Sequence, residues 1–152
     1  MGTWRTLSKD EWKYLFKTRS NASSLYNCGV KVCGKTNCVV LLPDYWEWDK
    51  LTDEPKVGTE WQTEYPATSD DKVTWKKMED AGAVCLPAAG LRNGSLVNSV
   101  GGDGFYWSST AYDYDKNDAH DVYFGYSMSG FIVVPDSRGH RYYGFSVRLI
   151  TE

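Results

Sequence analysis

Cys38-Val39-Val40-Leu41-Leu42 is the longest uninterrupted run of apolar residues in the chain. Its length and its β-branched content predict a buried strand, which Pro43 ends. Residues 34–37 (Gly-Lys-Thr-Asn) carry turn chemistry, and a second short segment at 29–33 precedes them. The sequence therefore predicts a β-hairpin with strands at 29–33 and 38–42.

One helix is expected on each side of this hairpin. Ser8 and Glu11 have the spacing of a capping box, and apolar residues follow at helical intervals, which predicts a helix over residues 9–18. A similar pattern predicts a second helix over residues 70–81, with Gly82 placed to end it.

The rest of the chain favours short β segments. We expect them at residues 84–87, 105–107, 122–124, 131–134 and 145–149. A helix, a hairpin, a second helix and then several strands predict the α+β class, with two helices packed on mostly antiparallel sheets and long loops. No repeat or linker-like tract divides the chain, so we expect one domain over residues 1–152.

Residues 44–70 are irregular and carry three tryptophans, Trp46, Trp48 and Trp61, among acidic residues, Pro and Gly. The first interpretation is that the three indoles anchor a long loop on the core. The alternative is that they are platforms on which sugar rings stack.

The charge and hydropathy of the chain exclude some classes of partner. The formal net charge is −3 and no basic run exceeds two residues, so the clustered Lys and Arg of a nucleic-acid surface are absent from the sequence. No apolar stretch has the length of a membrane span. We expect neither nucleic-acid binding nor direct membrane insertion.

The four cysteines are Cys28, Cys33, Cys38 and Cys85. Their spacing is not that of CxxC pairs and no histidine lies near them in the sequence, so we expect no metal and no cofactor. Cys33 and Cys38 bracket the expected turn, and a disulfide between them stays open, as do two buried free thiols.

Composition changes after Gly102. Seven of the eleven tyrosines lie between residues 106 and 143, and residues 103–151 hold no Glu, no Gln and one Lys, whereas the first 80 residues hold six Glu and ten Lys. Tyr with Asp, Ser, Asn and Gly is the composition of binding loops, in which rigid aromatic rings supply contact area. A β-rich half with many turns also explains the tyrosines, but it does not explain the loss of Lys and Glu.

Alternation along the expected strands divides this segment into a buried frame and a displayed part. Trp107, Val122, Phe124, Phe145 and Val147 alternate with polar residues and are expected to point inward. Their polar and tyrosine neighbours are expected to point outward or to lie on loops.

Several motifs resemble a known group of proteins. Residues 4–12 (WRTLSKDEW), 86–94 (LPAAGLRNG), 104–110 (GFYWSST) and 144–149 (GFSVRL) resemble core motifs of the formylglycine-generating-enzyme-like branch of the C-type lectin fold. The resemblance covers nearly the whole chain and implies a C-type lectin-like fold.

The C-terminal third also resembles the variable proteins of diversity-generating retroelements, in which NNY codons exclude Glu, Gln, Lys, Met and Trp. Between residues 103 and 149 the exceptions are Trp107, Lys116 and Met128. The resemblance implies a variable region at about 106–148 that binds a protein receptor or a surface glycan, on a cell surface or a phage tail. The displayed ligand-binding residues that it implies are Tyr112, Asp113, Tyr114, Asp115, Asn117, Asp118, His120, Asp121, Tyr123, Tyr126, Ser127, Ser129, Phe131, Asp136, His140, Tyr142 and Tyr143.

The sequence lacks several motifs of these groups of proteins, and some of their functions are therefore not expected. Formylglycine-generating enzymes need a late cysteine pair, and no cysteine follows Cys85, so their oxidase chemistry is not expected. The Glu-Pro-Asn and Trp-Asn-Asp calcium motifs of sugar-binding lectins are absent from the sequence. Asp113, Asp115 and Asp118 have the oxygen chemistry of a calcium site, but a solvated acidic loop explains them more simply.

Three functions compete at this point. The first is a ligand- or receptor-binding protein with a diversified surface, located outside the cell or on a virion. The second is an adhesin or carbohydrate-binding domain of fixed specificity. The third, an enzyme that uses His120, His140 or Cys85, is not expected because these residues lie in no motif with catalytic spacing.

Overall fold

The computed structural model describes residues 2–51 and 60–151 and is mostly β, with 45% strand and 16% helix. The strands are β1 (Trp4–Thr6), β2 (Tyr26–Val32), β3 (Lys35–Leu41), β4 (Glu64–Tyr65), β5 (Val84–Leu86), β6 (Leu91–Asn93), β7 (Leu96–Asn98), β8 (Gly104–Ala111), β9 (Asp118–Ser127), β10 (Gly130–His140) and β11 (Leu149–Thr151). The helical segments are α1 (Lys9–Lys13), the π-helix η1 (Tyr14–Thr18), the 3₁₀ helices η2 (Ala22–Ser24) and η3 (Trp48–Leu51), and α2 (Trp75–Asp80).

The predicted α+β fold of the C-type lectin type, with two helices packed on the sheets, is wrong. The described strands form several small sheets, and the only described helical run of seven or more residues is the continuous α1–η1 segment. The second predicted helix, over 70–81, shrinks to the six residues of α2, because the Ser69 hydroxyl accepts from the backbone amides of Asp71 and Lys72 and holds a turn. Thr74 caps α2.

The first predicted helix is present and begins where the sequence places it. The Ser8 hydroxyl accepts from the Glu11 amide, and a Glu11 carboxylate oxygen accepts from the Ser8 amide at 2.7 Å, so the capping box is complete. Arg5 donates to both carboxylate oxygens of Glu11. The Arg5 hydrogen bonds, followed by that from the Ser8 backbone, lower the pKa of Glu11 to about 2.

Strand β3 divides the hydrophobic core into two. It pairs with β2 and β5 in a four-stranded sheet of order β4-β2-β3-β5. Val39 and Leu41 face one cluster, which includes Trp12 and Phe124, while alternate residues such as Val40 face a second cluster around α2. The buried strand predicted from residues 38–42 is therefore confirmed, and it is buried on both faces.

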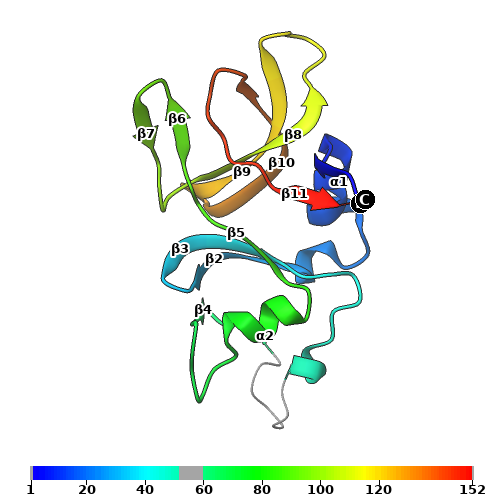
Figure 1. Cartoon of the computed structure of the whole chain (residues 1–152), viewed down its shortest axis with the longest axis vertical. Coiled ribbons are helices and arrows are strands. Elements are labelled where there is room, and N and C mark those ends of the chain that lie inside the picture. Colours follow the sequence, from blue (N-terminus) through cyan, green and yellow to red (C-terminus); the bar gives the residue numbers. More distant parts are fainter. Residues whose placement is uncertain (1, 52–59, 152) are drawn as a thin grey trace.

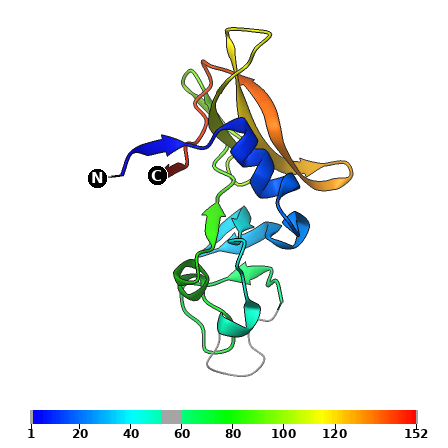
Figure 2. The same ribbon diagram turned by 90° about the vertical axis from the view of Figure 1, so that its right-hand side faces the viewer.

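The other large sheet holds β8, β9 and β10 in the antiparallel order β10-β9-β8. Figure 1 shows it at the opposite end of the molecule from β4 and α2. Strands β1 and β11 pair antiparallel and bring the two ends of the chain together, as Figure 2 shows. None of the described helices is long and apolar enough to cross a membrane.

Residues 145–148 do not form the predicted strand. Ser146 makes an isolated bridge to Tyr106 of β8, and Gly144 makes one to Arg92 of β6. This segment lies between β8 and the β6–β7 hairpin and joins them into one surface. Val147 is 53% exposed, so its predicted inward position is wrong.

The hairpin turn differs from the predicted one, with consequences for the cysteines. Val32 pairs with Lys35, so the turn consists of Cys33 and Gly34, and Cys38 faces Val30 instead of Cys33. All four thiols are free. The Cys38 and Cys85 side chains hydrogen bond each other, which lowers the pKa of Cys38 and raises that of Cys85.

Candidate functional site

The β8–β9–β10 sheet has one face in the core and one face away from it. Tyr106 on β8, with Val122 and Phe124 on β9, is buried in the first core cluster. Because side chains alternate along a strand, Phe105, Trp107 and Tyr123 lie on the opposite face.

A continuous row of aromatic rings covers that opposite face. We call it the aromatic row, and it consists of Tyr123, Phe105, Trp107, Phe145, Tyr143, Tyr142 and His140. The centroid distances between successive contacting rings range from 4.3 Å for Trp107–Phe145 to 5.7 Å for Tyr143–Phe145. Tyr142, 66% exposed, and His140 stand at its solvent-facing end, while the other rings are half-buried.

Gly139 provides the space that the centre of the row needs. A Cβ on Gly139 would lie 2.5 Å from the Phe145 ring and 3.2 Å from an Asp121 carboxylate oxygen. Only a hydrogen at this position lets Phe145 lie against β10 and contact Trp107. The ring positions in the aromatic row are therefore fixed by the backbone of β10 at Gly139 as well as by contacts between the rings.

Asp121 lies beneath the row with its carboxyl group shut off from water. It is 1% exposed and faces Trp107 on β8 and Ser137 on β10. Neither carboxylate oxygen makes a hydrogen bond of normal geometry to the described residues. Burial raises the pKa of Asp121 to about 7, and the nearby Ser137 hydroxyl acts in the opposite direction.

Asp118 supports the exposed end of the row. One of its carboxylate oxygens lies 2.6 Å from His140 Nδ1, and its backbone carbonyl accepts from Arg141. His140 then stacks on Tyr142 with 5.1 Å between ring centroids and 17° between planes. The Asp118 carboxylate thus holds the His140 ring in the position where it stacks on Tyr142.

A second aromatic group lies at the loop between β8 and β9. Tyr112 contacts Tyr114 and His120, with centroids 5.5 and 5.2 Å apart, and the Arg138 guanidinium lies 4.8 Å from the Tyr112 ring centroid. Tyr114 is 89% exposed. This loop is a second display position, separate from the aromatic row in its ring contacts.

A third group occupies the turn between β9 and β10. Tyr126 packs edge-on against Phe131, with 5.0 Å between centroids, and the Ser127 and Ser129 hydroxyls hydrogen bond each other. Tyr126 is 62% exposed, and Met128 at the tip is fully exposed.

The seventeen residues expected on display therefore fall into different environments. Exposed or partly exposed positions are Tyr112, Asp113, Tyr114, Asp115, Asn117, Tyr123, Tyr126, Ser127, Ser129, Phe131, Asp136, His140, Tyr142 and Tyr143. Asp118, His120 and Asp121 are buried, so their expected outward position is not found. Asp136 forms ion pairs with Lys13 and Lys17 and ties β10 to the first helix, which is a structural role.

Sequence reasoning missed Phe105 and placed Trp107 and Phe145 in the buried frame. All three belong to the aromatic row. Residues 105–107 are all aromatic, so alternation gives no sign of which ring faces the core. The pairing of Tyr106 with Val122 settles it, and that pairing is a tertiary fact.

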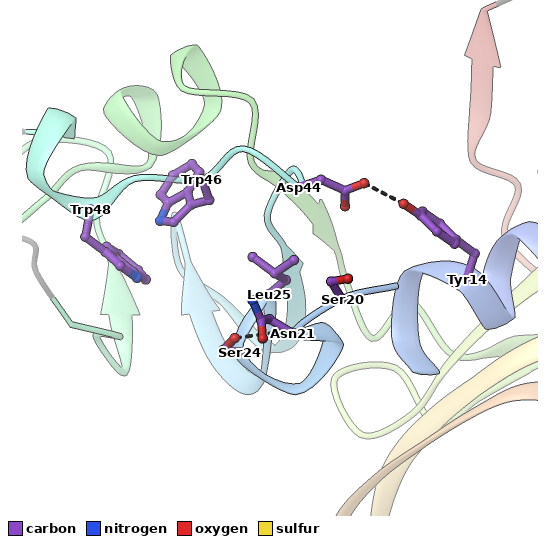
Figure 3. Close-up of a pocket in the computed structure, with 8 residues that line it drawn as sticks. All are labelled: Tyr14, Ser20, Asn21, Ser24, Leu25, Asp44, Trp46 and Trp48. Carbon is purple, nitrogen blue, oxygen red and sulfur yellow. Dashed lines mark hydrogen bonds between the residues drawn. The ribbon is translucent and has the colours of Figure 1, made fainter. Parts of the chain in front are cut away.

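A cavity of about 510 Å³ lies apart from the aromatic row, beside η1, η2 and the segment after β3 (Figure 3). Its lining residues are Tyr14, Ser20, Asn21, Ser24, Leu25, Asp44, Trp46 and Trp48. Trp46 contacts Trp48 edge-on, with 5.3 Å between ring centroids and 83° between ring planes. Trp61, which is not a lining residue, also contacts Trp48. The Trp46 indole nitrogen is buried and has no partner among the described residues.

Asp44 is held in place at the opposite end of this cavity from Trp48 (Figure 3). The Tyr14 hydroxyl donates to one carboxylate oxygen at 2.6 Å and the Arg19 guanidinium donates to the other at 2.9 Å. These two hydrogen bonds, that of Tyr14 first, lower the pKa of Asp44. The hydrogen bond to Asp44 in turn raises the pKa of Tyr14.

The described residues contain no group of three or more His, Cys, Asp or Glu side chains placed to hold a metal ion. Two acidic residues at the β8–β9 loop, Asp115 and Asp118, serve local structure. The Asp115 side chain accepts from the Asn117 amide, and Asp118 is engaged with His140.

Comparison with known proteins adds a family but no activity. Residues 41–150, well over half of the chain, match the model of a family described as a domain of unknown function (DUF8237). Neither the curated proteins nor the solved structures contain a significant match. The matched range includes the whole aromatic row, and it includes Asp44, Trp46 and Trp48 of the cavity but not the lining from η1 and η2.

Proposed function

We propose that this chain, which belongs to the DUF8237 family of domains of unknown function, is a ligand-binding protein that binds through the aromatic row and through the exposed tyrosines of the β8–β9 and β9–β10 loops. The observation that carries the proposal is the row itself. Seven rings contact one another across β8, β9 and the segment 140–145 on the face of the sheet opposite the core.

The physical case rests on how such rings bind. Tyrosine offers a flat apolar face and a polar tip, and its few rotatable bonds make its immobilisation inexpensive in entropy. Here the rings are already held by each other, by Gly139 and by the Asp118–His140 pair. A pre-formed surface loses less conformational freedom on binding than a flexible one, and this favours affinity.

We propose further that the exposed positions of this surface are diversified between copies of the gene. The support is compositional: residues 103–151 lack Glu and Gln and hold one Lys, although much of this segment is exposed. The exposed end of the row, formed by His140 and Tyr142, carries residue types that NNY codons supply. Trp107 and Phe145, at its centre, are the fixed base on which the variable residues rest.

The expected ligand is a protein receptor or a glycan on the surface of another cell or of a virus. The test uses fluorescently labelled protein and a panel of intact bacterial cells, with cell-associated fluorescence as the readout. A Tyr142→Ser/Tyr143→Ser double variant is compared with Tyr45→Ser, which removes a ring that is 77% exposed and lies outside the row.

We expect the double variant to lose binding by at least about tenfold, the effect of one or two aromatic anchors, while Tyr45→Ser binds like the parent. Equal binding by all three proteins would refute the proposal. Loss of binding by Tyr45→Ser alone would place the surface elsewhere. Treatment of the cells with protease or with periodate then separates a protein receptor from a glycan.

A further inference from the structure

The cavity in Figure 3 has the size and the lining of a small-ligand site. Its volume of about 510 Å³ is within the range of ligand pockets in proteins. Three aromatic side chains and Leu25 provide apolar wall, and the other four lining residues are Ser, Ser, Asn and Asp. Aromatic walls with a few convergent polar groups are the usual composition of such sites.

The two indoles that line the cavity offer surfaces at right angles. The planes of Trp46 and Trp48 meet at 83°, so the two lining indoles are nearly perpendicular. A saturated ring with a flat C–H face stacks on an indole face and leaves its substituents free for hydrogen bonding. Trp61 packs on Trp48 with 5.2 Å between centroids and limits its movement.

The charges around the cavity decide which class of ligand fits. Asp44 is the one formal charge among the lining residues, and the Arg19 guanidinium already compensates it at 2.9 Å. An anionic ligand would meet this carboxylate, and a cationic ligand would gain little from it, because Arg19, which is 5% exposed, already neutralises its charge. A neutral ligand meets neither difficulty.

Asp44 is also prepared to accept hydrogen bonds from such a ligand. Tyr14 and Arg19 use one lone pair on each oxygen, while the side chain stays 54% exposed. A carboxylate has about four acceptor positions, so about two remain for hydroxyl donors. At the other polar edge lie Ser20 and Asn21, both exposed. Fixed acceptors at one end and aromatic faces at the other match a polyol ring.

We propose that this cavity binds one neutral pyranose unit of a carbohydrate, with its C–H face on Trp48 or Trp46 and its hydroxyl groups on Asp44 and Asn21. This site is separate from the aromatic row and its existence does not depend on the function proposed for the row. It gives the chain a second, sugar-specific contact.

The test is a titration of ¹⁵N-labelled protein with glucose, galactose, mannose and N-acetylglucosamine, observed by NMR at the indole N–H signals. Trp48→Phe identifies the signal of Trp48. We expect at least one sugar to shift the Trp46 and Trp48 signals saturably, with a Kd on the order of 1–10 mM for a single ring. Glucuronate and glucosamine, the anionic and cationic counterparts, should bind more weakly.

Two variants and one control make the result decisive. Trp48→Ala should weaken binding at least about tenfold by removing a stacking face. Asn21→Gly should weaken it as well, and it leaves the fold intact because Asn21 has φ of 56°, a conformation that glycine adopts without strain. Tyr45→Ala, outside the lining, should bind like the parent.

The proposal is overturned if none of the four sugars shifts these signals, if glucosamine alone binds, or if binding survives both Trp48→Ala and Asn21→Gly. A Tyr142→Ser/Tyr143→Ser variant should bind the sugar like the parent. The sugar titration therefore tests the cavity independently of cell binding by the aromatic row.

Discussion

Asp121→Asn is expected to stabilise the protein at neutral and alkaline pH. The substitution keeps the size of the side chain and removes a carboxyl group that is 1% exposed and lacks hydrogen bonds of normal geometry. Burial raises the pKa of this group from 3.8 to about 7. Ionisation of Asp121 in the folded protein therefore costs free energy that an amide does not incur.

The sign and size follow from linkage. Below pH 3.8 the carboxyl group is protonated in both states and costs nothing. Between pH 3.8 and about 7 the unfolded state ionises and the folded state does not, so stability falls as pH rises, and above pH 7 the whole penalty is present. A shift of about 3 pH units corresponds to about 4 kcal/mol, which is an upper bound because water penetration and relaxation reduce it.

The assay is urea unfolding of parent and Asp121→Asn, followed by tryptophan fluorescence between pH 4.5 and 8. We expect the variant to gain on the parent by about 2–4 kcal/mol over this range, with most of the gain above pH 5. Asp136→Asn is the matched control with the opposite sign. Burial raises the pKa of Asp136, but the charges of Lys17 and Lys13 outweigh burial and lower it, so this variant should lose stability at neutral pH.

A constant difference between Asp121→Asn and the parent at every pH would refute the reasoning. It would mean that the pKa of Asp121 is the same in the folded and unfolded states, and that the aromatic row does not exclude water from its carboxyl group. A gain that grows as pH rises from 4.5 toward 7, beside a loss in Asp136→Asn that stays nearly constant over the same range, supports the structure of this face of the sheet.

Three further substitutions test other parts of the structure. Gly139→Ala places a methyl group against Phe145 and should cost about 1–3 kcal/mol in urea unfolding, with loss of cell binding. Arg19→Lys removes the fork that donates to the Leu15, Leu25 and Leu42 carbonyls and to Asp44, and should lower stability by about 3 kcal/mol, measured in the same way. Ser8→Ala breaks the capping box and should cost about 1 kcal/mol, seen as an earlier thermal transition.

The features that the sequence predicted well are local ones. The Ser8–Glu11 capping box involves residues three apart, and its hydrogen bonds form as soon as the first turn of helix forms. The buried strand at 38–42 follows from an apolar run that no exposed position tolerates. In both cases the information lies within a few residues of the feature.

The features that the sequence predicted poorly depend on contacts between distant segments. Alternation predicts outward display of Asp121, but the row that buries it includes Phe145 from a separate segment. The second helix lost its first turn to the Ser69 hydroxyl, and apolar periodicity does not weigh that competition. The fold class failed for the same reason, since the expected helices were counted from periodicity.

The cavity illustrates the same limit. Its lining comes from residues 14–25, at the first helix and the turn around η2, and from residues 44–48 after β3, with the whole β2–β3 hairpin between them in the sequence. The tryptophans were visible as stacking candidates. Their partner Asp44 was not, because its role depends on Arg19 reaching across from the end of η1.

The most direct test of the central claim is to sequence this gene from many isolates and map the substitutions on the structure. The account predicts that they concentrate at exposed residues of the aromatic row and of the tyrosine loops, such as Tyr114, Tyr126, His140 and Tyr142, while Trp107 and Gly139 stay constant. Substitutions spread evenly over the chain, or confined to positions away from the β8–β9–β10 sheet, would contradict it.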